Sequence, residues 1–282
     1  MVTHEYRVFA YVYRDRRNGQ SGAGIGKMNV TQSTVTARLK ILEQDLGQVL
    51  LNRHKSGTTL TPAGSKLLRY ARVMTGLWRQ AQNEAGLPDG MDSLFSFGCH
   101  SDLWSGPGKR IFDGILSEQP NMAVSVYQGG VQELQDWMVS GWVDVVLSYT
   151  PLARIGQQAH RIALDQLVLY SNRPDSPIAY DPGYVFVDYG EEYRRAHGEA
   201  YYDAGTAKIS FDSPVRAHEY LLERGGSAYL PSYMVTDDLT ERRLFALPRA
   251  PVFQRPVFIV SHDMTAQKWP WFADLIKCVS VL

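Results

Sequence analysis

The most reactive side chains that are neighbours in this sequence are Cys99, His100, Ser101 and Asp102. A thiol or hydroxyl beside an imidazole and a carboxylate is the chemistry of a nucleophilic hydrolase. Adjacent residues on one loop seldom reach the geometry of a catalytic triad, and the chain contains no G-x-S-x-G nucleophile elbow. We therefore predict no catalytic residue and no enzyme. Cys99 would sense oxidants only if its thiolate were stabilised, and we expect a buried, inert thiol instead.

Other signatures of metal or nucleotide chemistry are also missing from the sequence. Cys99 and Cys278 are the two cysteines, and neither belongs to a Cys-x-x-Cys or His/Cys cluster, so we expect no metal site. Gly26 and Lys27 are followed by Met28, where a phosphate-binding loop needs Ser or Thr. We predict that the protein uses no cofactor.

The stretch from Val30 to Glu43 has the pattern of a short amphipathic helix. Thr31 can cap its first turn, and a buried stripe recurs at helical spacing. That stripe consists of Val35, Leu39, Leu42 and Leu46, and the opposite face consists of Ser33, Thr36, Ala37 and Lys40. The opposite face is small, polar and free of acids, so it can enter the major groove of DNA. From this helix alone, an ordinary solvated surface helix explains the pattern equally well.

The residues that follow complete a DNA-binding unit. Residues 50–60 predict a short hairpin with a basic tip at Arg53 and Lys55. Thr61 and Pro62 then start a long helix, as its N-cap and its first helical residue. Helix, hairpin and long helix together predict a winged helix-turn-helix.

Charge is distributed unevenly although the net charge is zero. Residues 1–90 hold 13 Lys and Arg against 6 Asp and Glu, whereas the remainder holds 16 against 23. A basic N-terminal part favours a nucleic-acid partner for that part alone. No run of about 18 apolar residues exists and the N-terminus lacks the apolar core of a signal peptide. We therefore expect a cytoplasmic protein with no membrane partner.

The string T-Q-S-x-V-T-x-x-L-x-x-L-E-x-x-L-G-x-x-L-x-x-R, followed by L-T-P-A-G-x-x-L-L, resembles the LysR-type transcriptional regulators. The family usually carries Phe where this chain has Leu51, and two alanines where it has Gly24 and Ile25. Four glycines between Asn18 and Met28 cost roughly 1 kcal/mol each relative to Ala in a helix. We therefore expect a frayed or shortened helix there, with weakened DNA binding as a consequence.

The resemblance implies that the helix after Thr31 reads the major groove and that the wing contacts phosphates or the minor groove. The residues expected to bind double-stranded DNA at a promoter or operator are Gln32, Ser33, Thr34, Thr36, Arg38, Lys40, Arg53, Lys55 and Thr59.

The long helix from Pro62 to about Ala85 carries a heptad-like apolar stripe. Leu67, Ala71, Met74, Trp78 and Ala81 follow alternating steps of four and three residues. Packing within its own domain explains this spacing nearly as well. The resemblance favours a linker helix that pairs two subunits, in a homodimer or homotetramer, because two reading helices match two half-sites.

After a hinge at residues 86–90 the pattern changes to alternating strands and helices, which predicts a parallel sheet covered by helices. The phrase Q-P-N-M-A-V-S-V-Y-Q-G-G, with Asp144 further on, resembles the family's effector domain. We interpret Asp144 as structural, because it starts a buried strand.

The expected fold is therefore an N-terminal all-α winged helix-turn-helix plus a linker helix, then an α/β two-lobed effector domain that is periplasmic-binding-protein-like. We assign the winged helix-turn-helix to residues 1–61, the linker helix and hinge to 62–90, and the effector domain to 91–282. Within it, lobe I spans about 91–162 and 254–282, and lobe II spans about 163–253.

Ligands of open α/β sheets bind beyond the carboxyl ends of the strands. The loops at these ends, where the resemblance also places effector contacts, predict a small-molecule effector held by Cys99, His100, Ser101, Asp102, Gln128, Gly129, Ser148, Tyr149, Ser210 and Phe211. Ser101 and Ser148 suit helix or turn caps equally well.

The sequence thus predicts a sequence-specific DNA-binding regulator of transcription, whose activity an unknown small-molecule effector modulates between two lobes. The alternative is a solute-binding or enzymatic α/β domain with a degenerate DNA-binding module. The glycine-rich segment is the observation that favours this alternative.

Overall fold

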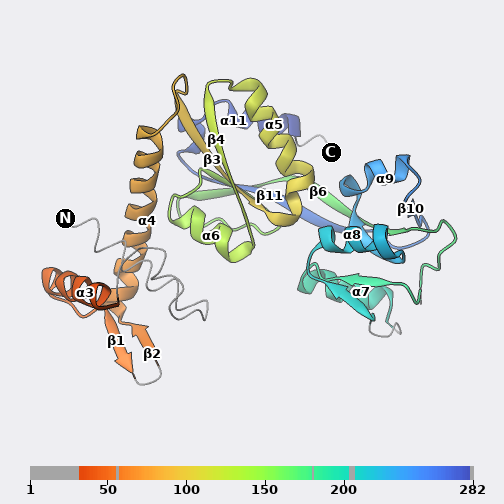
Figure 1. The fold of residues 1–282 in the computed structure, drawn as a ribbon, viewed down its shortest axis with the longest axis horizontal. Helices are drawn as coiled ribbons and strands as arrows, with labels where there is room; N and C mark the ends of the chain where they lie inside the picture. Colours follow the sequence, from red (N-terminus) through yellow and green to blue (C-terminus); the bar gives the residue numbers. More distant parts are fainter. Residues whose placement is uncertain (1–31, 55–56, 180, 203–206, 280–282) are drawn as a thin grey trace. The chain divides into compact units, whose positions relative to one another are not determined.

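The computed structural model describes residues 32–54, 57–179, 181–202 and 207–279, which are drawn as a ribbon in Figure 1. The chain divides into two compact units. The first is Met1–Phe97 with the short returns Asn121–Ser125 and Gln135–Asp144, and the second is Gly98–Pro120, Val126–Leu134 and Val145–Leu282. The sequence also predicts a first helix at residues 5–17, with Val8, Phe9 and Val12 on one side. This helix and the glycine-rich segment lie outside the described residues.

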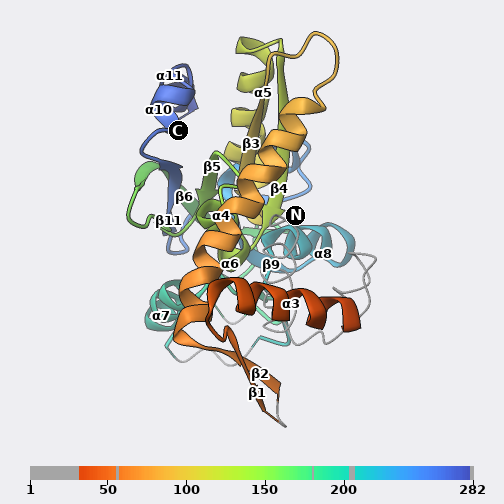
Figure 2. The same cartoon turned by 90° about the vertical axis from the view of Figure 1, so that its left-hand side faces the viewer.

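The winged part of the first unit follows the order expected from the sequence. It consists of α3 (Gln32–Leu46), β1 (Leu51–His54), β2 (Gly57–Leu60) and α4 (Pro62–Ala85). Figure 2 shows the two-stranded wing extending from the end of α4 that lies beside α3. Val35, Leu39 and Leu42 are buried together with Leu50 and Leu68, so three of the four predicted stripe positions are confirmed. Leu46 remains 39% exposed, because α3 ends directly after it at Gly47.

Hydrogen bonds of polar side chains connect α3, the wing and α4. The Glu43 carboxylate accepts hydrogen bonds from the backbone N–H groups of Leu50 and Leu51, at 2.8 and 3.3 Å. The Thr61 hydroxyl accepts from the Gly64 N–H at 2.9 Å and donates to the Val49 carbonyl at 2.7 Å. The predicted cap by Thr61 is thereby confirmed, and it also joins α4 to the start of the wing.

Gly64 lies where α4 comes closest to the wing, because a Cβ there would overlap the Leu50 carbonyl. We expect Gly64→Ala to destabilise the winged domain by about 2 kcal/mol or more, because overpacking against backbone leaves little room for relaxation. Gly198→Ala is the matched control: Gly198 is helical with open space around it, so Ala there should be neutral or stabilising. Equal thermal denaturation midpoints for the two variants would contradict the expectation.

One seven-stranded sheet forms the body of the effector domain. Its strand order is β10-β6-β11-β5-β3-β4, and β9 also pairs with β6. The strands are β3 (Ser93–His100), β4 (Met122–Gly129), β5 (Val145–Ser148), β6 (Gln157–Ser171), β9 (Ser227–Pro231), β10 (Phe245–Ala246) and β11 (Phe253–His262). β11 is antiparallel to both of its neighbours. The parallel arrangement expected from the strand–helix alternation concerns β3, β4 and β5, and β11, which returns the chain to the first lobe, adds an antiparallel strand between β5 and β6.

Strands β6 and β11 extend beyond the apolar runs in their sequences. β6 begins at Gln157, seven residues before the strand expected at Leu164, and pairs with β11 from Gln157↔His262 to Leu167↔Phe253. Backbone pairing over the whole length explains why polar residues continue the strand. The boundary expected near residue 163 therefore falls inside a continuous strand, and the two lobes share one pair of strands.

The second lobe packs helices against β6, β9 and a small parallel pair. Its further elements are β7 (Val185–Val187), α7 (Glu191–Ala200), β8 (Ile209–Phe211), α8 (Pro214–Arg224), a single turn η3 (Ser232–Met234) and α9 (Thr236–Thr240). Val187, Ala217, Leu221 and Leu230 are buried in its core. The sequence predicts second-lobe strands at 184–188 and 208–211 and a helix at 214–224, and β7, β8 and α8 confirm them.

The remaining helices are α5 (Lys109–Glu118), α6 (Val131–Val139), α10 (Thr265–Lys268) and α11 (Phe272–Val279), and the single turn η1 (Ser101–Leu103) follows β3. The sequence predicts a final helix over 269–279. This prediction is wrong in its first turn, because Pro270 disfavours helical backbone at Trp269 and α11 begins at Phe272. Asp144 accepts from the Ser96 N–H at 2.9 Å and donates its own N–H to the Ser96 carbonyl, which confirms its structural role.

Two functional classes receive no support from the described part of the chain. None of its helices is both long and apolar enough to cross a membrane. No three His, Cys, Asp or Glu side chains within it gather in a way that would hold a metal ion.

Candidate DNA-binding and effector-binding sites

The outer face of α3 is open and carries the small polar residues expected there. Ser33, Ala37 and Lys40 are exposed, and with Thr36 they line a shallow surface depression. Arg38 is placed differently: it is partly buried, and one guanidinium nitrogen is shielded without a hydrogen-bond partner among the described residues. The depression is a place where a convex edge, such as that of a base pair, can approach the helix closely.

The wing presents a second set of the predicted residues. Arg53 pairs with Thr58 and Asn52 with Thr59 across β1 and β2, and the Thr59 side chain is exposed. Lys55 lies outside the described residues. Wing and helix belong to one small core, so their backbones are fixed relative to each other.

The predicted stripe along α4 separates into two parts. Leu67 and Ala71 pack in the core of the winged domain, whereas Met74 and Trp78 are 37% and 45% exposed. Tyr70, Val73 and Leu77 are exposed as well, at helical spacing from Met74 and Trp78. The sequence pattern did not indicate Tyr70, Val73 and Leu77, because each of them precedes a heptad position by one residue.

A group of polar side chains gathers where β6 and β11 pass between the lobes. We call it the hinge cluster, and it consists of Asp102, Tyr149, Asp165, Tyr233 and Arg255. Asp102 lies in η1 after β3, Tyr149 directly follows β5, Asp165 and Arg255 lie on β6 and β11, and Tyr233 lies in η3. Asp165 and Arg255 are cross-strand partners in the antiparallel pair, which places their side chains on the same face of the sheet.

Hydrogen bonds connect the members of the hinge cluster. The Tyr149 hydroxyl donates to Asp165 Oδ2 at 2.8 Å, and the Tyr233 hydroxyl donates to the Asp102 carbonyl at 2.7 Å. The two phenolic oxygens are 3.3 Å apart. These bonds join η1 and β5, which come from the first lobe, to η3, which comes from the second.

Arg255 is held between two aromatic rings. Its guanidinium carbon is 3.4 Å from the centroid of the Tyr149 ring and 4.7 Å from that of Tyr189. Stacking of a guanidinium on aromatic faces is favourable and fixes its plane. The stack therefore positions the charge of Arg255 without using its N–H donors.

Burial shifts the titration of the acids in the cluster. Burial raises the pKa of Asp165 to about 6, although the Tyr149 hydrogen bond and the Arg255 charge oppose the shift. Burial likewise raises the pKa of Asp102 to about 6, against the opposing charge of Arg255. Burial and the Arg255 charge lower the pKa of His100 to about 4, so its ring is neutral near pH 7.

Two charged atoms of the hinge cluster have no hydrogen-bond partner within the described part of the chain. They are Nη1 of Arg255 and Oδ1 of Asp165, and both are shielded from solvent. An unpaired buried charge-bearing atom is costly, so such atoms in a native fold call for a partner that binds there.

The structure brings some of the predicted effector residues to the cluster and places others elsewhere. His100 lies against it, since its ring centroid is 5.4 Å from that of Tyr149. Cys99 and Ser148 are fully buried; burial raises the pKa of the Cys99 thiol, and the Ser148 hydroxyl caps the turn at Thr150. Ser101, Gln128 and Ser210 are exposed, Gly129 is buried, and the Phe211 ring lies 5.9 Å from that of Tyr220.

Sequence reasoning missed Asp165, Tyr189, Tyr233 and Arg255. The available signal was a charged residue beside an apolar run in each of two strands, at positions 165 and 255. Nothing in a single sequence indicated that these two strands pair in a register that places the charges opposite each other.

Comparison with known proteins identifies both parts of the chain. Residues 7–65 match the bacterial regulatory helix-turn-helix proteins of the lysR family, and residues 93–277 match the LysR substrate binding domain. The HTH-type transcriptional regulator HdfR of Yersinia pestis (strain Pestoides F) is 24% identical over 272 residues, which cover 92% of this chain and 90% of that protein.

Solved structures share the fold over nearly the whole length. ArgP from Mycobacterium tuberculosis has a TM-score of 0.62 at 17% identity, over 98% of this chain and 96% of that one. Full-length LysG from Corynebacterium glutamicum with bound effector Arg has a TM-score of 0.57 at 15% identity, over 100% of this chain and 98% of that one. The chain belongs to the LysR family of bacterial transcriptional regulators, with an N-terminal DNA-binding domain and a C-terminal effector-binding domain.

Proposed function

We propose that this regulator binds its operator through the outer face of α3 and the wing, and that its effector is an α-amino acid or a similar zwitterion held at the hinge cluster. The observation that carries the effector proposal is the pair of unpartnered atoms of opposite charge, Arg255 Nη1 and Asp165 Oδ1.

The DNA-binding proposal rests on surface chemistry. In the depression on α3, Ser33 and Thr36 offer hydroxyls to base edges and Lys40 offers a cation to phosphate or guanine. Small side chains allow the helix backbone to approach the base pairs. The remaining residues in the proposed interface are Gln32, Thr34, Arg38, Arg53, Lys55 and Thr59.

The effector proposal follows from complementary charge. A guanidinium with a free N–H pairs with a carboxylate, and a carboxylate oxygen without a donor pairs with an ammonium group. A zwitterion satisfies Arg255 and Asp165 at once, whereas a simple anion would leave the acids unpaired. Since both atoms are shielded, entry of the ligand requires the lobes to part at the strands they share.

Asp102 adds a second acidic group for the ligand's cationic end. Its carboxylate accepts a hydrogen bond from the Ser213 hydroxyl, and the charge of Asp212 raises its pKa. Asp212 and Ser213 both follow β8 in the second lobe. The cluster thus holds more acids than Arg255 can balance, which favours a ligand with an additional amine. The other residues that we retain in the effector site are the predicted loop residues around His100, Gln128, Tyr149 and Ser210.

Several further assignments belong to the same proposal. The winged domain spans 1–61, the linker 62–90 and the effector domain 91–282. The protein acts by binding rather than by catalysis, and it acts in the bacterial cytoplasm, where its DNA target lies.

The exposed face of α4 is proposed as the contact between two subunits. Met74, Leu77 and Trp78 expose large apolar side chains in helical register, which is unfavourable unless a partner covers them. We expect Trp78→Glu to convert dimers into monomers in sedimentation velocity at micromolar concentration. Glu84→Gln, on the exposed end of the same helix, should leave the sedimentation coefficient unchanged. A Trp78→Glu protein that remains dimeric would exclude this face.

The effector class can be tested with the twenty L-amino acids and the full-length protein. We expect at least one of them to bind in isothermal titration calorimetry. The decarboxylated amine and the deaminated acid of the best binder should each bind at least tenfold more weakly, because each loses one of two charged hydrogen bonds. The proposal fails if folded protein that binds DNA takes up none of the twenty, or if an analogue lacking one charge binds equally well.

A further inference from the structure

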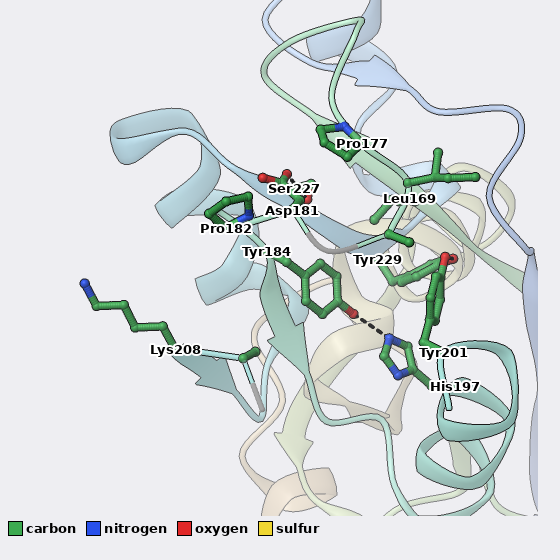
Figure 3. Close-up of a pocket in the computed structure, with 13 residues that line it drawn as sticks. Leu169, Pro177, Asp181, Pro182, Tyr184, His197, Tyr201, Lys208, Ser227 and Tyr229 are labelled. Atoms are coloured by element: carbon green, nitrogen blue, oxygen red, sulfur yellow. Dashed lines mark hydrogen bonds between the residues drawn. The ribbon is translucent and has the colours of Figure 1, made fainter. Parts of the chain in front are cut away.

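The second lobe contains a cavity of about 360 Å³ that shares no lining residue with the hinge cluster. Figure 3 shows it in close-up. Leu169, Pro177, Ile178 and Ala179 contribute apolar wall, and a set of ring side chains closes one side. This volume is within the range of small-molecule sites, and a mostly apolar lining with a few convergent polar groups is their usual composition.

Four ring side chains supply the polar groups, and they form two hydrogen-bonded pairs. The Tyr184 hydroxyl and His197 Nε2 are 2.8 Å apart, and the Tyr201 and Tyr229 hydroxyls are 2.7 Å apart. The Tyr184 and His197 rings are stacked, with 16° between their planes. The two pairs adjoin, because the His197 ring centroid is 4.9 Å from that of Tyr201 and 5.9 Å from that of Tyr229 (Figure 3). The side wall therefore consists of flat faces, against which a planar ring packs well.

The hydrogen-bonding capacity of the tyrosine pair is not exhausted. Two phenols carry two hydroxyl hydrogens, and the bond between Tyr201 and Tyr229 uses one of them. The second hydrogen has no acceptor within the part of the chain that the structure describes. When Tyr201 donates within the pair, the free hydrogen is that of the fully buried Tyr229, and an oxygen atom of a ligand in the cavity can accept it.

The charged groups at the cavity are either occupied or turned away. Asp181 accepts from the Gly183 N–H at 2.9 Å and from the Ser227 hydroxyl at 2.6 Å. The Lys208 side chain extends away from the rings in Figure 3. Burial lowers the pKa of His197 and raises those of Tyr184 and Tyr229, so these groups are neutral near pH 7. Among the described residues of the cavity, a charged ligand would therefore find no free counter-charge beside the rings.

We propose that this cavity is a second ligand site, distinct from the effector site at the hinge cluster, and that it binds a small uncharged aromatic ring bearing a hydroxyl group. The ring packs between the apolar wall and the stacked side chains, and its oxygen accepts the free hydrogen of the tyrosine pair. Aliphatic alcohols lack the flat face, and aromatic carboxylates carry a charge that nothing in the cavity balances.

Phenol is the probe, and the full-length protein is titrated with it in calorimetry. We expect a dissociation constant on the order of 1 mM, which is reasonable for so few atoms. Benzoate and cyclohexanol should each bind at least fivefold more weakly. Failure of phenol to bind folded protein at about 10 mM, or equal binding of benzoate, would overturn the proposal.

Two variants locate the binding. Ala179→Trp places a large ring in the cavity wall and should weaken phenol binding at least tenfold, whereas Ala153→Trp, at an exposed position outside the lining, should not change it. Tyr201→Phe removes one hydroxyl of the pair with little change of shape and should weaken phenol about threefold or more. It also keeps the test decisive if Ala179→Trp does not fold. Unchanged binding in folded Tyr201→Phe and Ala179→Trp proteins would assign phenol to another surface.

Discussion

Arg255→Gln is expected to abolish most of the affinity for the amino acid that the wild-type protein binds best. The substitution keeps a polar side chain on β11 but removes the charge that faces the ligand's carboxylate. A charge-assisted hydrogen bond contributes about 1.5 to 3 kcal/mol, so the dissociation constant should rise roughly 10- to 100-fold in calorimetry. Asp165→Asn should have an effect of similar size, because the ligand's ammonium group loses its acceptor.

The matched controls are Arg249→Gln and Asp175→Asn, which make the same chemical changes at exposed positions outside the cluster. They should bind the amino acid as the wild type does. If Arg255→Gln folds, binds operator DNA and retains full affinity for the amino acid, the zwitterion is not held at the hinge cluster.

The affinity for the amino acid should also fall as the pH falls, because the hinge cluster must offer an ionised carboxylate. The ammonium group needs an ionised Asp165, and burial raises the pKa of that carboxyl to about 6 in the free protein. Binding therefore competes with protonation as the pH falls, and the dissociation constant should rise about fivefold between pH 6 and 5 while staying flat between pH 7 and 8. His100, with its pKa lowered to about 4, stays neutral over this range. Asp165→Asn should leave only the smaller pH dependence that Asp102 contributes.

Ala37→Glu is expected to remove specific operator binding. Ala37 is exposed in the centre of the depression on α3, so a carboxylate there would face the phosphates and base edges at the closest approach. Repulsion and loss of close packing should weaken binding at least 100-fold in gel-shift titrations with the DNA upstream of its own gene.

Gln82→Glu on α4 adds the same charge outside the proposed interface and should bind the operator nearly as well as the wild type. Lys40→Ala gives an independent readout, because loss of one phosphate contact should weaken binding at all sequences and reduce the salt slope by about one. Full operator affinity in a folded Ala37→Glu protein would show that another surface reads the DNA.

Local patterns in the sequence were enough to predict the winged domain. The spacing of Val35, Leu39 and Leu42 and the cap of α4 by Thr61 are short-range features, and each acts within a few residues of itself. The helix expected from Pro62 to about Ala85 is confirmed as α4 for this reason. The family was also evident from local motifs, because the LysR pattern is concentrated in residues 31–68 and at Asp144.

Tertiary structure decided which residues join the predicted Asp102 and Tyr149 in the proposed effector site. Asp165 and Arg255 are ninety positions apart, and they become neighbours only through the register of β6 and β11. That register depends on backbone pairing over the full length of both strands, including polar stretches with no strand pattern. Likewise, Tyr184, Tyr229 and the end of α7, which carries His197 and Tyr201, converge on one cavity from different parts of the chain. Side-chain periodicity reports which face of an element is buried, but it carries no information about which distant element that face will meet.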